Sequence, residues 1–179
     1  MSAHANNADA SPTVLVRPAT ATEVASLPQI EQEADEIFRR IGMGLVTDLP
    51  ASAPSDYADS LAAGGVIIAF TDRTVGFVRV DRVDGVPHVE QLSVLPEYRG
   101  YRIGAALLDA AAQWAKSDGA DRMTLCTFRD VPWNGPYYAR LGWTLLPEPD
   151  YGPGLLRLRQ NEIEAGLHAW PRQVMTRSL

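Results

Sequence analysis

Residues 92–105 form the segment of this sequence best suited to bind a phosphorylated ligand. They read Leu-Ser-Val-Leu-Pro-Glu-Tyr-Arg-Gly-Tyr-Arg-Ile-Gly-Ala and lie where a strand pattern ends and a helical pattern begins. Gly100 and Gly104 allow the backbone to turn sharply or to approach a ligand closely. N–H groups at a helix start bind anions, and Arg99 and Arg102 can add charge-assisted hydrogen bonds. The segment therefore indicates a loop that binds a pyrophosphate.

Two better-known phosphate-binding motifs do not fit this segment. A dinucleotide-binding fingerprint would need three glycines spaced G-x-G-x-x-G, and a P-loop would need Gly-Lys followed by Ser or Thr. Neither spacing occurs here. A plain strand-to-helix turn is the simplest alternative, because two glycines beside arginines are a weak motif on their own.

The phosphate loop needs a strand before it and a helix after it, and the flanking sequence predicts both. Residues 86–95 follow the turn signal Asp84-Gly85 and have the pattern of a strand. Residues 103–116 repeat apolar side chains at helical spacing, and Gly119 ends that pattern. The loop is therefore predicted to join a strand to an amphipathic helix.

The rest of the chain also divides into predicted strands and helices. Strands are predicted at 13–17, 66–70, 74–80, 123–128, 143–146 and 173–177, and helices at 20–40, 136–140 and 155–167. Pro28 marks a break or a second helical start, and a short helix after residues 55–57 ends at Gly64-Gly65. A tight turn at 71–73 joins two antiparallel strands. This order predicts an α/β fold around one mixed sheet.

Length and composition favour one globular domain. The chain has 179 residues, of which 46% are hydrophobic and 21% charged, as in average globular proteins. Residues 1–12 are small and polar, which predicts a disordered tail, and no linker divides 13–179, which predicts a single domain.

Several classes of partner and location are disfavoured by the composition. No run approaches the roughly 18 to 20 apolar residues of a membrane span, and the N-terminus lacks the pattern of a signal peptide, which predicts a cytoplasmic protein. A net charge of -6 disfavours nucleic-acid binding. Cys126 is the sole cysteine, is interpreted as a buried small hydrophobe, and has no metal-ligand cluster around it in the sequence. No metal is therefore predicted.

The phosphate segment resembles the acetyl-CoA signature of the GNAT N-acetyltransferase superfamily. The resemblance rests on residues 92–94, Pro96, residues 98–104 and Ala106-Leu107-Leu108. The family pattern is Arg or Gln, two residues, Gly or Ala, one residue, then Gly or Ala, and Arg102 stands where glycine is usual. A backbone N–H donates whatever the side chain is, so binding tolerates this departure, which can change the geometry of the loop.

The resemblance implies a GNAT-like fold and acetyl-CoA as the cosubstrate. Such a fold has a mixed, mostly antiparallel central sheet that splays open at the acetyl-CoA site and is flanked by helices. The exposed strand edge pairs with the pantetheine arm, and the loop wraps the pyrophosphate. The residues that the resemblance implies for acetyl-CoA binding are Leu92, Ser93, Val94, Arg99, Gly100, Tyr101, Arg102, Ile103, Gly104, Ala105, Asn134 and Tyr138.

A candidate general acid also follows from the resemblance. Residues 136–143 are similar to the family's late helix, which ends in an aromatic residue, Tyr, two residues and Leu-Gly-Phe. Tyr138 aligns with the tyrosine that in many members lies beside the CoA sulfur. A phenol with a pKa of about 10 stays protonated at neutral pH and can protonate a thiolate. The alternative for Tyr138 is packing beside Trp143, and Tyr137 is interpreted as packing.

Glu90 is the candidate base. It lies two residues before Leu92, so strand alternation places both on one face. Many enzymes of this type use a glutamate on this strand, either directly or through water, whereas in others water alone serves. His88 is a second candidate because of its titration range, although a lone histidine is more often structural. An exposed strand glutamate without a catalytic role is the remaining alternative for Glu90.

The acceptor is the least determined part of the prediction. A primary amine of a small molecule is expected, with a protein or peptide amine and a non-catalytic acyl-CoA sensor as alternatives. The resemblance implies direct transfer without a covalent acyl-enzyme, and family habit allows a homodimer. Phe128, Arg129 and Trp133 are expected beside the acceptor pocket. The acidic stretch at Glu31, Glu33, Asp35 and Glu36 is interpreted as a solvated helix face rather than a surface that attracts an amine.

Overall fold

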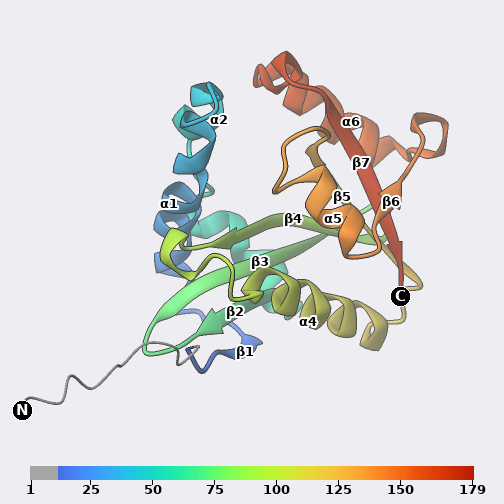
Figure 1. Ribbon diagram of the computed structural model, residues 1–179. Helices are drawn as coiled ribbons and strands as arrows, with labels where there is room; N and C mark the ends of the chain where they lie inside the picture. Colours follow the sequence, from blue (N-terminus) through green and yellow to red (C-terminus); the bar gives the residue numbers. More distant parts are fainter. Residues whose placement is uncertain (1–11) are drawn as a thin grey trace, which may run out of the picture.

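The computed structural model describes residues 12–179, and a seven-stranded sheet lies at its centre (Figure 1). The strand order is β1-β2-β3-β4-β5-β7-β6. The strands are β1 (Leu15–Pro18), β2 (Val66–Phe70), β3 (Thr74–Val83), β4 (Val86–Val94), β5 (Arg122–Phe128), β6 (Thr144–Leu145) and β7 (Arg172–Ser178). The tail predicted for residues 1–12 lies, except for Pro12, outside the described residues.

Six α-helices accompany the sheet within the described residues. They are α1 (Leu27–Arg39), α2 (Gly44–Asp48), α3 (Ala58–Ala62), α4 (Ile103–Ser117), α5 (Gly135–Arg140) and α6 (Pro153–Glu164). Short 3-10 turns occur at Val24–Ser26, Pro54–Tyr57, Pro96–Tyr98, Glu148–Asp150 and Leu167–Ala169. No helix within residues 12–179 has the length and hydrophobicity needed to cross a membrane, and the cytoplasmic location stays a prediction.

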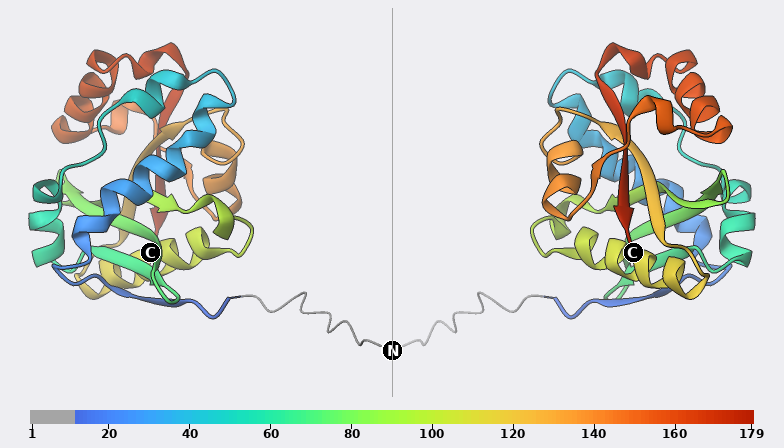
Figure 2. Two further views of the ribbon diagram at one scale, coloured as in Figure 1. Left: turned by 90° about the vertical axis from the view of Figure 1, so that its left-hand side faces the viewer. Right: turned by 90° about the vertical axis from the view of Figure 1, so that its right-hand side faces the viewer.

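The sheet is mixed and mostly antiparallel, which confirms the predicted fold class. Strands β1 to β4 form antiparallel neighbours, β4 pairs with β5 in parallel, and β7 pairs with both β5 and β6 in antiparallel. Helix α4 packs across β1 to β4, and α1 packs on β3 and β4. The two side views show α1 nearest the viewer from one direction and β5 and β7 nearest from the other (Figure 2).

The sheet splays open between β4 and β5. Within the described residues these strands pair at His88 with Thr124 and at Val89 with Leu125, and their ladder ends there. Residues 91–94 of β4 keep their ladder to β3, and among the described residues 90–94 have no strand partner on the side of β5. The two halves of the sheet therefore diverge, with α1 beside one half and α6 beside the other (Figure 1).

A β-bulge lies on β4 where the splay begins. Arg79 of β3 is opposite Gln91 and Val80 is opposite Val89, so Glu90 is an extra residue without a partner on β3. A bulge interrupts the alternation of side chains. Glu90 and Leu92 line the same cleft, as their predicted common face requires, and the bulge adds to the simple alternation on which that prediction rested.

The elements form where local chemistry supports them. Strand β2 carries five consecutive apolar residues and is buried along most of its length. Helix α4 turns an apolar stripe onto the sheet through Ile103, Leu107, Leu108, Ala111 and Ala115. Pro28 lies in the first turn of α1, which confirms it as a helical start. Asp84 stabilises the start of α6, because its carboxylate accepts hydrogen bonds from the backbone N–H groups of Gly154 at 2.7 Å and Leu155 at 3.1 Å.

Candidate active site

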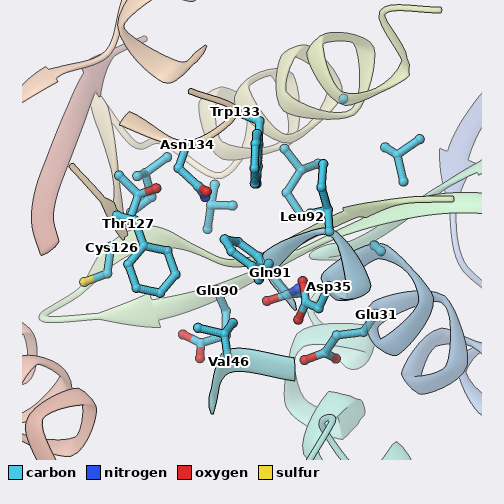
Figure 3. A pocket seen from close by; sticks show the side chains of 18 of the residues that line it. Glu31, Asp35, Val46, Glu90, Gln91, Leu92, Cys126, Thr127, Trp133 and Asn134 are labelled. Atoms are coloured by element: carbon cyan, nitrogen blue, oxygen red, sulfur yellow. The ribbon is translucent and has the colours of Figure 1, made fainter. Parts of the chain in front are cut away.

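A cleft of about 800 Å³ lies where the two halves of the sheet diverge. Its walls come from α1, α2, β4 and the start of α4 on one side and from β5, α5, α6 and Arg172 of β7 on the other. Figure 3 shows side chains from both walls pointing toward a common space. The cleft is therefore built from segments that are far apart in the sequence.

The phosphate loop bends sharply at the start of α4. Gly100 has a φ of +90° and Arg102 a φ of +60°. Both values lie in the left-handed region, which residues other than glycine rarely adopt. The first backbone bond of the helix runs from the N–H of Ala106 to the carbonyl of Arg102 at 3.1 Å. The N–H groups of residues 103–105 therefore lack an acceptor within the helix and are suited to bind an anion.

Arg99 lies in this loop and connects it to α1. Its guanidinium donates to the carbonyl oxygen of Ala34 at 2.7 Å, and it lines the cleft. Burial lowers the pKa of Arg99, and neighbouring Arg40 lowers it further. One of the two arginines predicted at the loop thus also fixes the position of α1.

Helices α4 and α5 approach each other closely at Gly104. A Cβ atom added to Gly104 would lie 2.8 Å from the hydroxyl oxygen of Tyr137. The glycine therefore leaves room for Tyr137, which lines the cleft beside the phosphate loop. Tyr137 also packs on Tyr138 with ring centroids 5.5 Å apart, so its predicted packing role is confirmed.

Tyr138 lies between the cleft and the core. Its side chain is 9% exposed, lines the cleft and packs against Trp143 with ring centroids 6.1 Å apart. Burial raises its pKa, and Tyr137 raises it further. The phenol is therefore protonated across the physiological range. Packing beside Trp143 and exposure to the cleft coexist, so the two interpretations of Tyr138 are compatible.

Four polar groups in the wall on the side of β5 are buried without a hydrogen-bond partner among residues 12–179. They are the side-chain oxygens of Thr127 and Asn134, the indole nitrogen of Trp133 and the Nε of Arg172, and all four residues line the cleft. Figure 3 shows Thr127, Asn134 and Trp133 in this wall. Buried polar groups nearly always have partners, so such groups in a cleft indicate a polar ligand.

Glu90 projects from the bulge into the cleft (Figure 3). Its side chain is accessible from the cleft, yet enough protein surrounds it that desolvation raises its pKa. Asp81 raises the pKa further, whereas Arg79 lowers it. A carboxylate with a raised pKa is a stronger base, which suits Glu90 to accept a proton.

His88, the second candidate base, also lines the cleft but is more deeply buried than Glu90. It is 2% exposed, and its Nδ1 lies 2.9 Å from the hydroxyl oxygen of Thr124 on β5. Burial lowers its pKa to about 4, so its imidazole is neutral at physiological pH. This bond joins the two strands at one of their few paired positions, which favours a structural role for His88.

Two acidic side chains of α1 also line the cleft, which corrects part of the sequence interpretation. Glu31 and Asp35 are partly buried and face the cleft, whereas Glu33 and Glu36 are exposed. Burial raises the pKa of Asp35 to about 7, with a further increase from Glu31, and burial also raises the pKa of Glu31. The sequence indicates that Glu31 and Asp35 share one face of the helix, because residues four apart lie on the same side.

Arg172 contributes a buried charge to the same wall. Its guanidinium lies 4.3 Å from the ring centroid of Phe128 and pairs with Glu162 of α6. The prediction that Phe128 and Trp133 flank the pocket is confirmed, because both line the cleft. Arg129 is instead exposed and pairs with Asp130 at 2.9 Å.

The remaining predicted residues divide into two groups. The predicted cosubstrate-binding residues that line the cleft are Leu92, Val94, Arg99, Gly100, Arg102, Ile103, Gly104, Asn134 and Tyr138, whereas Ser93, Tyr101 and Ala105 do not line it. Ser93 is buried, and its hydroxyl accepts a hydrogen bond from Gln91 at 2.9 Å. That Ser93, Tyr101 and Ala105 bind acetyl-CoA through their backbone groups stays a prediction. Cys126 lines the cleft half-buried, and burial raises the pKa of its thiol to about 11.

Comparisons with known proteins agree with this geometry. The family model described as Acetyltransferase (GNAT) family matches residues 27–143. A PaiA N-acetyltransferase from Thermoplasma acidophilum, solved in complex with coenzyme A, is 14% identical with a TM-score of 0.67, and the match covers 93% of this chain and 99% of that one. A GNAT-family acetyltransferase from Staphylococcus aureus is 17% identical with a TM-score of 0.65, and the match covers 93% and 99% of the two chains.

A longer enzyme contains the same fold as one part. N-acetylglutamate synthase from Neisseria gonorrhoeae, solved with coenzyme A and N-acetylglutamate, is 15% identical with a TM-score of 0.65. The match covers 93% of this chain and 35% of that enzyme. At such identities the three structures establish a shared fold.

Proposed function

Because the chain belongs to the GNAT acetyltransferase family, we propose that it transfers an acetyl group from acetyl-CoA to the primary amine of a small molecule. The observation that carries the proposal is the meeting of three features in one cleft: the unpaired edge of β4, the anion-binding start of α4 and the protonated phenol of Tyr138. A small acceptor is supported by the walls that α1 and α6 add on opposite sides.

The residues on both walls fit acetyl-CoA. In the proposed complex the backbone of residues 92–94 pairs with the amide groups of the pantetheine arm, as an added strand would. The N–H groups of residues 103–105 bind the pyrophosphate, with Arg102 as an additional charge. The unpartnered oxygen of Asn134 accepts a hydrogen bond from the pantetheine. These assignments use groups that otherwise lack partners.

The reaction is a direct attack in a ternary complex. The amine nitrogen forms a bond to the acetyl carbonyl carbon while Glu90, directly or through water, accepts a proton from that nitrogen. A backbone N–H near Val94 stabilises the charge on the carbonyl oxygen. The carbon–sulfur bond then breaks, and Tyr138 donates its proton to the leaving thiolate. The products are an amide and CoA with a free thiol. The proposed location is the cytoplasm, and a homodimer is compatible with the mechanism.

The experiment that tests this function measures thiol release from acetyl-CoA across a panel of amines. Tyr138→Phe removes the proposed acid with little change in volume, and kcat is expected to fall by about 10²-fold. Tyr151→Phe is the matched control, because this substitution removes the same hydroxyl group from a tyrosine that lies outside the cleft. Tight binding of acetyl-CoA without thiol release for any amine would contradict the proposal and favour a sensor.

A further inference from the structure

We infer that the acceptor carries a second cationic nitrogen besides the reacting amine, and that Glu31 and Asp35 of α1 bind this second charge. The inference rests on the proposed function, because it concerns the acceptor half of the same cleft. The chemical class is that of small diamines and related dications.

The two carboxylates are arranged as one acidic surface. Glu31 and Asp35 are four residues apart on α1 and project toward the space that Glu90 also faces (Figure 3). The carboxylate of Glu31 accepts hydrogen bonds from the Tyr57 hydroxyl at 3.3 Å and the Ser52 N–H at 3.4 Å. Among the side-chain hydrogen bonds of residues 12–179, the one that involves Asp35 reaches its backbone carbonyl oxygen, from the Thr47 hydroxyl at 3.4 Å, and none reaches its carboxylate. Asp35 is therefore available to a ligand.

Arg79, Arg99 and Arg172 offset the charge of these carboxylates only in part, because desolvation still raises the pKa of each carboxylate. Glu31 raises the pKa of both Asp35 and Glu90, so its carboxylate repels each of the other two. Two of these guanidinium groups pair with other carboxylates, Arg79 with Asp81 at 2.6 Å and Arg172 with Glu162, and Arg99 donates to the carbonyl oxygen of Ala34. A bound dication would relieve this repulsion, because each positive charge offsets a partly desolvated negative one.

A second observation points to a polar ligand in the same cleft. Thr127 is 2% exposed and lines the cleft, and its hydroxyl oxygen is among the buried groups without a partner in the described part of the chain. A hydroxyl can accept a hydrogen bond from an ammonium group or donate one to a polar acceptor. Thr127 therefore provides a polar contact in the wall on the side of β5, independently of the acidic surface.

The spacing of the acidic groups favours an organic cation. Across the described residues, no three side chains from His, Cys, Asp and Glu are placed to hold one metal ion. Glu31, Asp35 and Glu90 are therefore suited to charges separated by a carbon chain rather than to one compact ion. Phe38 and Val46 also line the cleft and can contact methylene groups.

The test compares cadaverine with pentylamine, which differ by one amino group at the far end of the same carbon chain. Binding to the full chain saturated with CoA is measured by calorimetry, and KM is measured by thiol release. We expect cadaverine to bind at least about tenfold more tightly, consistent with one partly buried ion pair. In Glu31→Gln combined with Asp35→Asn, the ratio of the two affinities is expected to fall toward one. Glu33→Gln is the control, because Glu33 is exposed on the same helix.

The outcomes separate this inference from the proposed function. Equal affinities for the two amines, absence of cadaverine binding, or a ratio that survives the double substitution would each overturn the second-cation inference. Thiol release with other amines would still support acetyl transfer in those cases. Selective binding of cadaverine without thiol release from any amine would support the inference and contradict acetyl transfer.

Discussion

Glu90 combines a special backbone position with a perturbed pKa. The bulge leaves it opposite no residue of β3 and directs its carboxylate into the cleft. Desolvation, then Asp81, raises its pKa, while Arg79 and Arg172 limit the increase. A base works best when its pKa lies near the operating pH, so a raised value improves proton acceptance from an amine. The bulge thus places one carboxylate where it can be both accessible and poorly solvated.

Replacement of Glu90 by glutamine is expected to lower kcat by about 10²-fold, because the amide cannot accept the proton. The wild-type rate should fall as the pH drops through the raised pKa of Glu90, and this dependence should be missing from the variant. The pH profile of kcat/KM checks the prediction. Glu97→Gln is the control, because Glu97 lies outside the cleft and pairs with exposed Arg73. Identical profiles for wild type and Glu90→Gln would assign the proton to water.

Asp35 should make stability depend on pH. Its pKa rises from 3.8 to about 7 in the folded protein, through burial and Glu31, with Arg99 opposing the increase. The native state therefore holds the proton more tightly than the unfolded chain, so this stabilisation is complete below pH 3.8 and is lost as the pH rises through about 7.

Asp35→Asn removes the cost of burying that charge. The variant should have a larger free energy of unfolding than wild type above about pH 8, by at most about 4 kcal/mol, and the difference should vanish below about pH 4. Urea denaturation across this pH range measures it. A difference that is the same at every pH would show that Asp35 titrates normally.

At the scale of elements, the contact between α4 and α5 sets the shape of the cleft. Gly104→Ala would place a Cβ atom 2.8 Å from the Tyr137 hydroxyl, so the Tyr137 side chain or the start of α4 has to shift. We expect KM for acetyl-CoA to rise several-fold to about tenfold, because a shift of Tyr137 or of the first turn of α4 would disturb the proposed pyrophosphate site. Adding Tyr137→Phe removes the overlapping oxygen and should restore much of the affinity. Without such rescue, the effect of alanine would come from the loop backbone instead.

Most elements follow from local patterns, and the exceptions have physical causes. Strands β2 to β5 and helix α4 are close to their predicted ranges, because turn residues bound long apolar patterns. Helix α2 was not predicted, since its five residues, Gly-Leu-Val-Thr-Asp, are too few to show a helical period. Strand β6 pairs over two residues, which is shorter than the predicted 143–146.

The acidic half of the cleft was not predictable from the sequence. Periodicity identifies the helix face of Glu31 and Asp35, but it does not tell whether that face meets solvent, core or a cleft. That depends on α6 and β5, which come far later in the chain. The bond from His88 to Thr124 joins residues 36 apart, and a single sequence gives no sign of it. The phosphate loop was predictable because its strand, turn and helix are consecutive.

At the scale of the molecule, two diverging half-sheets share a short parallel ladder. Strands β4 and β5 are joined at two residue pairs, and His88 reinforces the junction. A smaller apolar cluster that contains Phe38, Met43, Phe128 and Val131 joins α1 to β5 across the cleft. A cosubstrate held by β4, α4 and α5 would therefore connect both halves.

Hydrogen exchange should reveal this connection. Saturating CoA is expected to slow exchange of edge amides within residues 90–94 and of residues 103–105 by at least about tenfold, because bound amides exchange after the ligand leaves. Short labelling times should show no change in β2, which is paired on both sides. Unchanged exchange at 90–94 in the presence of CoA would place the pantetheine elsewhere.

The unpaired edge of β4 also bears on the shelf life of the protein. A strand edge with free amide and carbonyl groups is a template on which another chain can add a strand, the first event of many precipitations. Occupancy by CoA would shield that template. Concentrated stocks stored with CoA should therefore scatter less light over time than stocks stored without it, so that the cosubstrate acts as a preservative.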